Sequence, residues 1–543
     1  MEISMKKRML SLSLVLAMTV PAIAMESSAE ELRTVTLLGQ ECRFNYANMM
    51  TEDRERYECW QQLEDILAER NLQLDCEVVA RDQFSTVIQT RTASGDLPDI
   101  VNLSCLEDAA ALRLGMGGML MPINKLLQEN GGEEAWAYIN EKLPFIVKRL
   151  TAEDGNIYWL PSVYPIMTYQ GKAASTGTTM LIRQDWLDKA GLEMPKTAEE
   201  FKEVLRTFQE QDMNGNGVKD EVLILDPATN NGSLFGNGVA QWFGLGDNIV
   251  SYDIANKKVI CPWYSEGLKP YLEYVKSLID EGLIDTNLIG LSSNEQVDQK
   301  MAENAVAAEN SWMMETWLEP MIDGVSDALL APMEPLDAVE GVNPYIILES
   351  SEATLAKFAV SSDCEDLEAV ADLFNYLYSD EYAEFGTWGV KGESFDDSNG
   401  YNEYLGVYTG DNKVAQAEQG KTTINDLVGY DALLPTIRYA TLDAEINSVV
   451  PEKAEYQKNI IDYEYVLAMD IRTFQALPSE EQASRLAEIK TDLETYSREI
   501  LANIVLGRSS IDDLDSYIEE LKSMGLDEYI QINQELCDRY NAE

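Results

Sequence analysis

The fold is decided by residues 179–224, which read TMLIRQDWLDKAGLEMPKTAEEFKEVLRTFQEQDMNGNGVKDEVLI. A strand is predicted over residues 180–183 and a helix over residues 185–190. Gly191 ends this helix, because glycine readily adopts the left-handed conformation found after helix C-termini. A second helix follows, and a strand is predicted over residues 222–224. Such alternation of strands and helices indicates an α/β fold.

The second helix of this stretch begins after Pro195 and Thr197, residue types that favour helix N-termini. Its apolar residues are spaced three, one and three positions apart, as one buried helical face requires. These residues are Phe201, Val204, Leu205 and Phe208. The helix leads directly into the acidic loop of residues 212–221.

That loop, DMNGNGVKDE, has the spacing of a calcium site, since calcium takes six to eight oxygen ligands. The expected ligands are Asp212, Asn214, Asn216, the Val218 carbonyl, Asp220 and Glu221. Gly217 allows the sharp bend between them. An EF-hand has a glutamate at its twelfth position, where this chain has Leu223. Glu221 must replace it, so the loop closes more tightly than an EF-hand.

The alternative for residues 212–221 is a simple turn rich in glycine and asparagine that joins a helix to a strand. Alternating oxygen ligands, the glycine and the terminal acidic pair together favour calcium (Ca2+). All the expected ligands are local and none is left open for catalysis, so a structural ion is expected.

The first 24 residues are expected to be a secretory signal peptide. Basic residues at positions 6–8 precede an apolar run over residues 9–20, and a small-x-small cleavage signal ends at Ala24. The run is too short for a membrane span. No cysteine follows it directly, since the first is Cys42. An extracellular, cell-surface protein without a lipid-anchoring cysteine is therefore expected.

Composition excludes several classes of function. The chain has 41 Lys and Arg against 95 Asp and Glu, a formal net charge of −54, so its surface repels nucleic acid and anionic lipid. It has no histidine, which removes Ser-His and Cys-His catalysis and His-based zinc sites. Its 7 cysteines lack CxxC spacing, so neither a disulfide scaffold nor a zinc site is expected.

The N-terminal half is predicted to begin with a parallel sheet. Strands are predicted over residues 34–38 and 72–79, residues 95–103 are predicted to turn and enter a third strand, and helices are predicted over residues 55–69 and 82–93. Ligands of such sheets bind at the carboxyl ends of the strands. Ser104 directly follows the third strand, so it is expected at that edge.

Later segments are less regular. Residues 230–247 are glycine-rich, a strand is predicted over residues 305–309, and residues 385–395, FGTWGVKGESF, are predicted to form a loop. From residue 462 onward the chain is predicted to be helical, and an apolar stripe over residues 486–504 marks one long buried helix face.

Three motifs resemble extracellular solute-binding protein family 1 of ABC importers. They are residues 93–100 (ASGDLPDI), residues 182–191 (IRQDWLDKAG) and the loop of residues 212–221. The chain is most similar to the long Gram-positive branch that carries an EF-hand-like calcium loop. The resemblance covers nearly the whole chain after the signal peptide.

The resemblance implies a two-lobed type II periplasmic-binding-protein fold, α/β in each lobe, with a helical C-terminal extension. By analogy, the first lobe contains residues 32–165 and 330–385. The second contains residues 166–329 and 386–543 with the C-terminal helices. Such a protein is a non-enzymatic monomer that captures an oligosaccharide between its lobes and delivers it to the transmembrane subunits of an ABC permease.

Sugar rings bind aromatic planes by their apolar faces, and polar side chains by their hydroxyls. The expected ligand-binding residues are Ser104, Tyr164, Arg183, Trp242, Asn310, Trp312 and Trp388, with Trp317 as a further candidate. Trp312 and Trp388 are preferred, because one follows a strand and the other lies in a glycine-rich segment. Each aromatic residue has a core position as its alternative, and Arg183 has an internal ion pair.

The sequence departs from the family at two places. The N-terminal cysteine that usually carries a lipid is missing, and the family's GxEG loop reads Gly389-Val-Lys-Gly392, with Lys391 in place of an acidic residue. Two alternatives remain open: a secreted carbohydrate-active enzyme, such as a glycosidase or lyase, and a peptide-binding receptor of the same fold. In so acidic a chain, a pair of carboxylates is no evidence for a glycosidase.

Overall fold

The computed structural model describes residues 32–41, 51–163, 168–169, 172–173, 179–225, 234–246, 249–289, 295–311, 329–347, 356–396, 398, 403–404, 423–428, 432–437, 466–469 and 471–542. The expected signal peptide and the aromatic candidates Tyr164, Trp312 and Trp317 lie outside these ranges.

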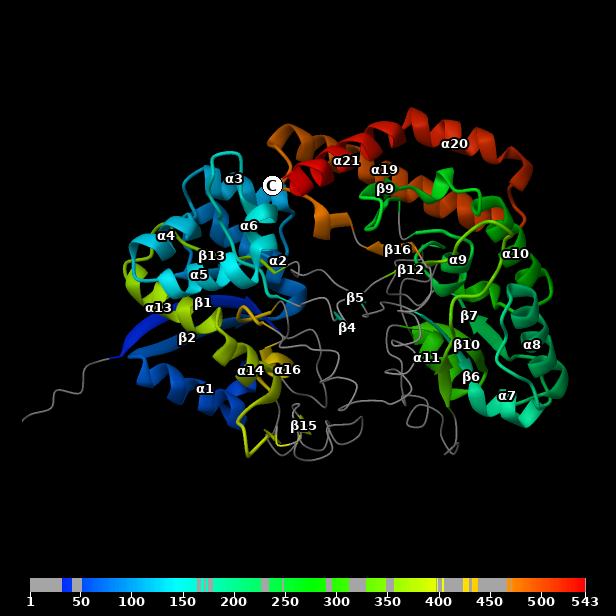
Figure 1. Cartoon of the computed structure of the whole chain (residues 1–543), viewed down its shortest axis with the longest axis horizontal. Coiled ribbons are helices and arrows are strands. Elements are labelled where there is room, and N and C mark those ends of the chain that lie inside the picture. The colour runs from blue at the N-terminus through cyan, green and yellow to red at the C-terminus, as the bar shows by residue number, and fades with distance from the viewer. Residues whose placement is uncertain are drawn as a thin grey trace, which may run out of the picture.

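The first lobe, on the left in Figure 1, is built on a sheet with the strand order β13-β3-β1-β2. The strands are β1 (Arg33–Gln40), β2 (Leu72–Val79), β3 (Ile100–Asn102) and β13 (Phe358–Val360). β1 is parallel to β2 and β3, which confirms the predicted parallel sheet, and β13 is antiparallel to β3. α1 (Glu58–Glu69) and α2 (Arg81–Ser94) connect the parallel strands.

Further helices complete this lobe. They are η2 (Thr51–Arg56), α3 (Asp108–Met116), α4 (Ile123–Glu129), α5 (Glu133–Lys142), α6 (Pro144–Leu150), α13 (Leu367–Leu377), α14 (Asp380–Trp388) and α16 (Ile424–Val428). The prediction of a loop over residues 385–395 is wrong at its start, because α14 continues to Trp388. Ser379 caps α14 by accepting a hydrogen bond from the Tyr382 amide, and the buried Tyr382 and Phe385 hold it against the lobe.

The second lobe, on the right in Figure 1, has a mixed sheet with the strand order β11-β6-β10-β7. Its strands are β6 (Thr179–Arg183), β7 (Val222–Ile224), β10 (Val306–Ser311) and β11 (Leu330–Pro332). β10 is parallel to β7, whereas β6 is antiparallel to both β10 and β11. Its helices are α7 (Gln184–Ala190), α8 (Ala198–Gln211), α9 (Gly238–Trp242), α10 (Leu268–Asp280) and α11 (Glu295–Ala302).

The stretch that decides the fold forms the predicted elements within a residue or two of the predicted ends. Gly191 ends α7 with a φ of 69°. Thr197 caps α8, since its side chain accepts a hydrogen bond from the Glu200 amide. The predicted apolar face of α8 is buried in the second lobe.

A third sheet has the strand order β12-β16-β8-β9. Its strands are β8 (Ser251–Asp253), β9 (Lys258–Ile260), β12 (Tyr345–Ile347) and β16 (Val466–Met469). β16 corrects the prediction that the chain is helical from residue 462 onward, because residues 466–469 pair with β12 and β8. The remaining short elements are η4 (Pro262–Tyr264), η5 (Thr286–Leu288), and the hairpins β4 (Thr168–Tyr169) with β5 (Lys172–Ala173) and β14 (Phe395–Asp396) with β15 (Glu403–Tyr404).

A C-terminal layer of helices completes the fold and lies across the top of Figure 1. We use this name for η6 (Ile471–Phe474), α19 (Glu480–Val505), η7 (Ile511–Asp513), α20 (Leu514–Ser523) and α21 (Leu526–Ala542). The long helix predicted from the apolar stripe is α19, which buries Ile489, Leu493 and Ile500. The molecule is thus an α/β protein of two lobes with a helical C-terminal extension.

The hydrophobic side chains form two large cores, one in each lobe. Two segments pack differently from the lobe boundaries expected by analogy. Met333 and Leu336 belong to the second core, because β11 pairs with β6. Residues 424–428 and 432–437 pack buried apolar side chains in the first core, where Ile424 and Leu433 are both 0% exposed. The chain therefore returns to the first lobe after residue 386.

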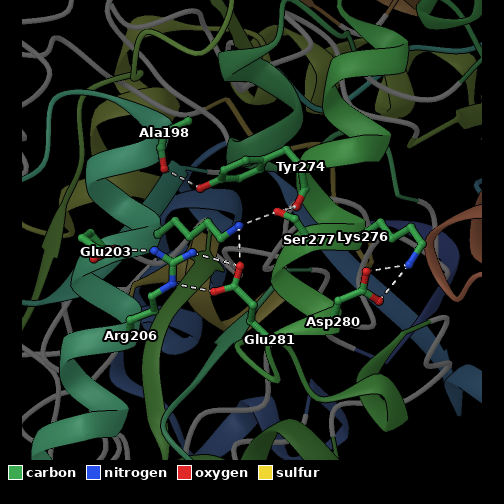
Figure 2. A network of polar contacts seen from close by, with 9 residues as sticks. Ala198, Glu203, Arg206, Tyr274, Lys276, Ser277, Asp280 and Glu281 are labelled. Atoms are coloured by element: carbon green, nitrogen blue, oxygen red, sulfur yellow. Dashed lines mark hydrogen bonds and ion pairs between the residues drawn. The ribbon is translucent and has the colours of Figure 1, made fainter.

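A polar network joins α8 to α10 in the second lobe (Figure 2). The Arg206 guanidinium donates two hydrogen bonds to Glu281, over 2.5 and 2.9 Å, and Lys202 lies 2.7 Å from the same carboxylate. The hydrogen bonds from Arg206, together with Lys202, lower the pKa of Glu281 to about 2. Tyr274 donates to the Ala198 carbonyl over 2.6 Å, so a second contact joins the first residue of α8 to α10.

Within the described residues, none of the helices has the length and apolar character needed to cross a membrane.

Candidate functional site

Polar side chains gather at the carboxyl end of the first sheet, as predicted for Ser104. Ser104 is half-buried, and its hydroxyl accepts a hydrogen bond from the Gln40 amide over 3.3 Å. Gln40 ends β1 and Asn102 ends β3, so two neighbouring strands supply this edge. Asn102 is fully buried, and its Oδ1 accepts a hydrogen bond from the Ser104 backbone over 2.9 Å.

Residues 432–437 cover one side of this edge. The Ala432 carbonyl accepts hydrogen bonds from the Gln40 backbone, over 3.0 Å, and from the Asn102 side chain, over 2.8 Å. A Cβ atom at Gly39 would lie 2.6 Å from the Ala432 oxygen, so only glycine permits this close approach. The edge is therefore held rigidly, with Gln40 and Ser104 as its accessible polar side chains.

Gln40 was missed by the sequence analysis. The signal was present, because Gln40 is the last residue of β1 and lies at the same sheet edge as Ser104. The rule that selected Ser104, a polar residue where a parallel strand ends, applies equally to Gln40.

In the second lobe, Asn310 lies near the end of β10 and is 1% exposed. Its Oδ1 accepts a hydrogen bond from the Gly238 backbone, over 2.8 Å, at the first residue of α9. Its Nδ2 is buried and has no hydrogen-bond partner in the described part of the chain. A buried amide donor without a partner is costly, which suits a group that a ligand satisfies.

The two described tryptophan candidates lie in hydrophobic cores rather than on exposed loops. Trp242 is 2% exposed and packs edge-on against Phe201, with 5.1 Å between ring centroids. Trp388 is 3% exposed and packs against Phe395. Trp242 ends the short helix α9 within the glycine-rich segment, and Trp388 ends α14 where a loop is predicted from the sequence. Both rings therefore occupy core positions, which was the alternative to ligand binding for each of them.

Arg183 is held by internal partners. It is fully buried, and its guanidinium donates to Asp185 over 2.7 and 2.6 Å and to Asn304 over 2.6 Å. It also lies 4.0 Å above the ring of Trp186. The internal ion pair, which was the alternative for this residue, therefore accounts for its position.

The loop of residues 212–221 is held by hydrogen bonds among its own polar groups. The Asp212 Oδ2 accepts from the Gly217 backbone over 2.9 Å, and Glu221 Oε1 accepts from the Asn214 backbone over 3.3 Å. The amide nitrogens of Asn214 and Asn216 donate to Asp220 over 3.0 and 3.1 Å. Val218 is exposed, and Asp212 has a φ of 50°.

Two carboxylate oxygens of this loop, Asp212 Oδ1 and Glu221 Oε2, are buried without a hydrogen-bond partner in the described chain. Glu221 is fully buried. Buried carboxylates are stable only when they are paired or coordinate a metal, so these oxygens fit a cation. In the described residues, no group of three His, Cys, Asp or Glu side chains is arranged for a metal, so amide and backbone oxygens would have to complete this site.

Comparison with known proteins identifies the family. A family model described as bacterial extracellular solute-binding protein matches residues 69–384, more than half of the chain. The chain belongs to this family.

Relatives and solved structures agree with this assignment. The fructooligosaccharide ABC transporter substrate-binding protein FusA of Streptococcus pneumoniae is 25% identical over 468 residues, which cover 83% of this chain and 81% of FusA. The polygalacturonan/rhamnogalacturonan-binding protein YtcQ of Bacillus subtilis is 24% identical over 42% of this chain and 41% of YtcQ.

Among solved structures, an EF-hand mutant of S. pneumoniae FusA in complex with fructo-nystose is 19% identical. It has a TM-score of 0.70 and covers 94% of this chain and 100% of that chain. An HMO-binding, ABC-transporter-associated solute-binding protein from Bifidobacterium longum infantis is 20% identical. It has a TM-score of 0.67 and covers 94% of this chain and 99% of that chain. These likenesses confirm the two-lobed solute-binding fold.

Proposed function

We propose that this protein is the extracellular substrate-binding component of an ABC importer and that its ligand is an oligosaccharide. It binds the sugar between its lobes as a monomer, leaves it chemically unchanged and delivers it to the transmembrane subunits. The observation that carries this proposal is the similarity to FusA, which extends over 83% of the chain and whose name specifies fructo-oligosaccharides. YtcQ, a second relative, is also named for carbohydrate polymers.

The polar groups at the two sheet edges suit hydroxyl recognition. Gln40 and Ser104 in the first lobe, and Asn310 in the second, are neutral amides and a hydroxyl that both donate and accept hydrogen bonds. Sugar hydroxyls have the same dual character. The buried Nδ2 of Asn310 is the donor with the most to gain from a ligand acceptor.

A thermal-shift screen tests the class of ligand. The panel contains kestose, nystose, galacturonate oligomers, human milk oligosaccharides and short peptides. At least one oligosaccharide is expected to raise the melting temperature, because a ligand that binds only the folded state stabilises it. Stabilisation by peptides alone would support the peptide-receptor alternative. Release of shortened sugar during incubation would support the enzyme.

Asn310→Asp tests the site in the second lobe. The substitution keeps the acceptor for Gly238 but removes the amide donor, so affinity for the sugar found in the screen should fall about tenfold, or about 1.4 kcal/mol. Asn237→Asp is the matched control, because Asn237 is also buried but donates to Leu234 and Tyr271 within the lobe. It should lower stability and leave affinity unchanged. If Asn310→Asp and Asn237→Asp bind the sugar with equal affinity, Asn310 does not contact the ligand.

We also propose that residues 212–221 bind one structural calcium ion. Asp212 and Glu221 supply the buried oxygens, and Asn214, Asn216, the Val218 carbonyl and Asp220 complete the donor set. The ion offsets two of the three carboxylate charges and ties the end of α8 to the start of β7. FusA, the similar protein, has a solved structure described as an EF-hand mutant, which supports this assignment.

Calcium should raise the melting temperature of the wild type, and chelation should reverse the effect. At a hundredfold excess over the dissociation constant the gain is about 2.7 kcal/mol. Asp212→Asn should abolish the response, whereas Asp492→Asn, an exposed aspartate of α19, should retain it. An equal calcium response in Asp212→Asn and the wild type would show that this loop is only a turn.

Export rests on the N-terminal sequence. We propose that the signal peptide is cleaved after Ala24, so mass spectrometry of the native protein should find Met25 as the first residue. A secreted protein that retains Met1 would contradict this cleavage.

A further inference from the structure

The C-terminal layer is firmly attached to the second lobe. Helix α19 packs against α10, and the Trp263 indole donates to Ser497 over 2.9 Å. The Val259 backbone donates to Gln534 over 2.8 Å, so α21 is joined to β9. Phe474 stacks on Tyr252 of the third sheet, with 4.8 Å between ring centroids. The layer should therefore move with the second lobe.

The same layer also reaches into the first lobe. Leu477 is 5% exposed and belongs to the hydrophobic core of the first lobe. Its backbone donates a hydrogen bond to the Arg149 carbonyl at the end of α6, over 3.1 Å. The Arg539 guanidinium of α21 donates to the Leu477 carbonyl. In Figure 1, the C-terminus accordingly lies beside α3 and α6.

Charged and aromatic groups strengthen this junction. The Lys148 ammonium lies 5.9 Å from the centre of the Tyr540 ring. Burial acts to raise the pKa of Asp108, at the start of α3, but the charges of Lys357, Arg149 and Arg472 outweigh burial and lower it. Arg472 belongs to the C-terminal layer and the other three to the first lobe, so an electrostatic contact crosses the junction. Helix α19 also packs against α3.

The short chain segment between the two attachments limits how far the lobes can separate at this junction. Phe474 is bound to the second lobe and Leu477 to the first, only three residues apart in sequence. Three residues span at most about 11 Å when fully extended. The lobes therefore cannot separate at this edge unless Leu477 leaves its core.

We propose that the junction of Leu477, Arg539 and Tyr540 with α6 is a pivot for lobe motion and sets the resting separation of the two lobes. A rotation that opens or closes the lobes keeps this edge together and moves the opposite edge most. The C-terminal layer is then a brace with a broad attachment on the second lobe and a small attachment on the first. This inference concerns the free protein and does not depend on the ligand.

Small-angle X-ray scattering of the ligand-free protein tests the pivot. The double variant Arg539→Ala/Tyr540→Ala removes the α21 side of the junction, and Leu477→Ser weakens its insertion in the first core. Both should have a larger radius of gyration and maximum dimension than the wild type. In hydrogen exchange, the Leu477 amide should lose its protection, because its bond to Arg149 opens.

One control and one further junction variant complete the test. Tyr264→Phe removes the hydrogen bond to Asp527 within the second-lobe attachment, so its scattering should match the wild type. Lys148→Ala changes only a half-buried side chain of the first lobe and should shift the scattering in the same direction as the double variant, by less. If circular dichroism shows that Leu477→Ser is unfolded, the scattering of the double variant and of Lys148→Ala decides whether the pivot exists. Folded variants with wild-type scattering would overturn the pivot.

Discussion

Arg183 keeps a positive charge in the interior of the second lobe. Its guanidinium is satisfied by a bidentate pair with Asp185 and by Asn304, and its face lies on Trp186. Such a cluster depends on every member, because the loss of one partner leaves the other buried and unsatisfied. The same arginine in an open cleft would be free to bind a ligand, so its surroundings determine its role.

Arg183→Ala should lower the free energy of unfolding by about 3–5 kcal/mol, because Asp185 and Asn304 lose their buried partner. Urea unfolding followed by tryptophan fluorescence measures the loss. Arg485→Ala is the control, since Arg485 pairs with Glu528 on the surface, and it should change stability little. A variant of normal stability that has lost its sugar affinity would instead make Arg183 a ligand residue.

Glu281 should make the stability of the protein depend on acid pH. Its pKa is about 2 in the folded state, below the ordinary 4.5, mainly because Arg206 hydrogen-bonds to its charged form. The carboxylate thus contributes stability above about pH 4.5, and this contribution is lost as the pH falls toward about 2.

Glu281→Gln should therefore lower the melting temperature at neutral pH and reduce its further loss in acid. Melting curves between pH 7 and about pH 3 measure both effects. Glu193→Gln replaces an exposed glutamate of the same lobe and should follow the wild-type profile. If Glu281→Gln runs parallel to the wild type throughout, the ion pair with Arg206 contributes no pH dependence.

At the scale of elements, local signals located most helices and strands. The glycine after α7, the threonine before α8 and the apolar spacing within α8 are all encoded within a few residues of each boundary. Helix α14 shows where such signals fail. Gly386 lies inside this helix, and the Asn425 side chain approaches it so closely that a Cβ atom there would lie 2.9 Å from Asn425 Oδ1. That contact is distant in sequence and leaves no local pattern.

Helix α19 offers a direct test of a local signal. Ser479 and Gln482 form a capping box, in which each side chain accepts from the other's backbone over 3.2 Å. Ser479→Ala should lower stability by about 1 kcal/mol and speed hydrogen exchange in the first turn. Thr491→Ala, at an exposed position of the same helix, should not lose stability, because alanine favours helices more than threonine does. Equal effects of the two variants would contradict the importance of the cap.

At the scale of the whole molecule, the α/β class and the two lobes could be predicted from motifs and strand–helix alternation. The return of residues 424–428 and 432–437 to the first lobe could not be predicted, because their apolar side chains would suit either core. The candidate site could also be predicted only in part. Ser104 and Asn310 lie at the ends of strands, whereas Trp242 is buried by a contact with Phe201 that is remote in sequence, and Trp388 is buried against Phe395.

The central claim is that the protein binds an oligosaccharide and does not alter it. The most direct measurement is calorimetric titration of the calcium-saturated protein with the best sugar of the screen, followed by mass spectrometry of the recovered sugar. We expect a saturable heat with one sugar per chain and recovery of the sugar at its original mass. Absence of binding across the oligosaccharide panel, or recovery of shorter sugars, would contradict the claim.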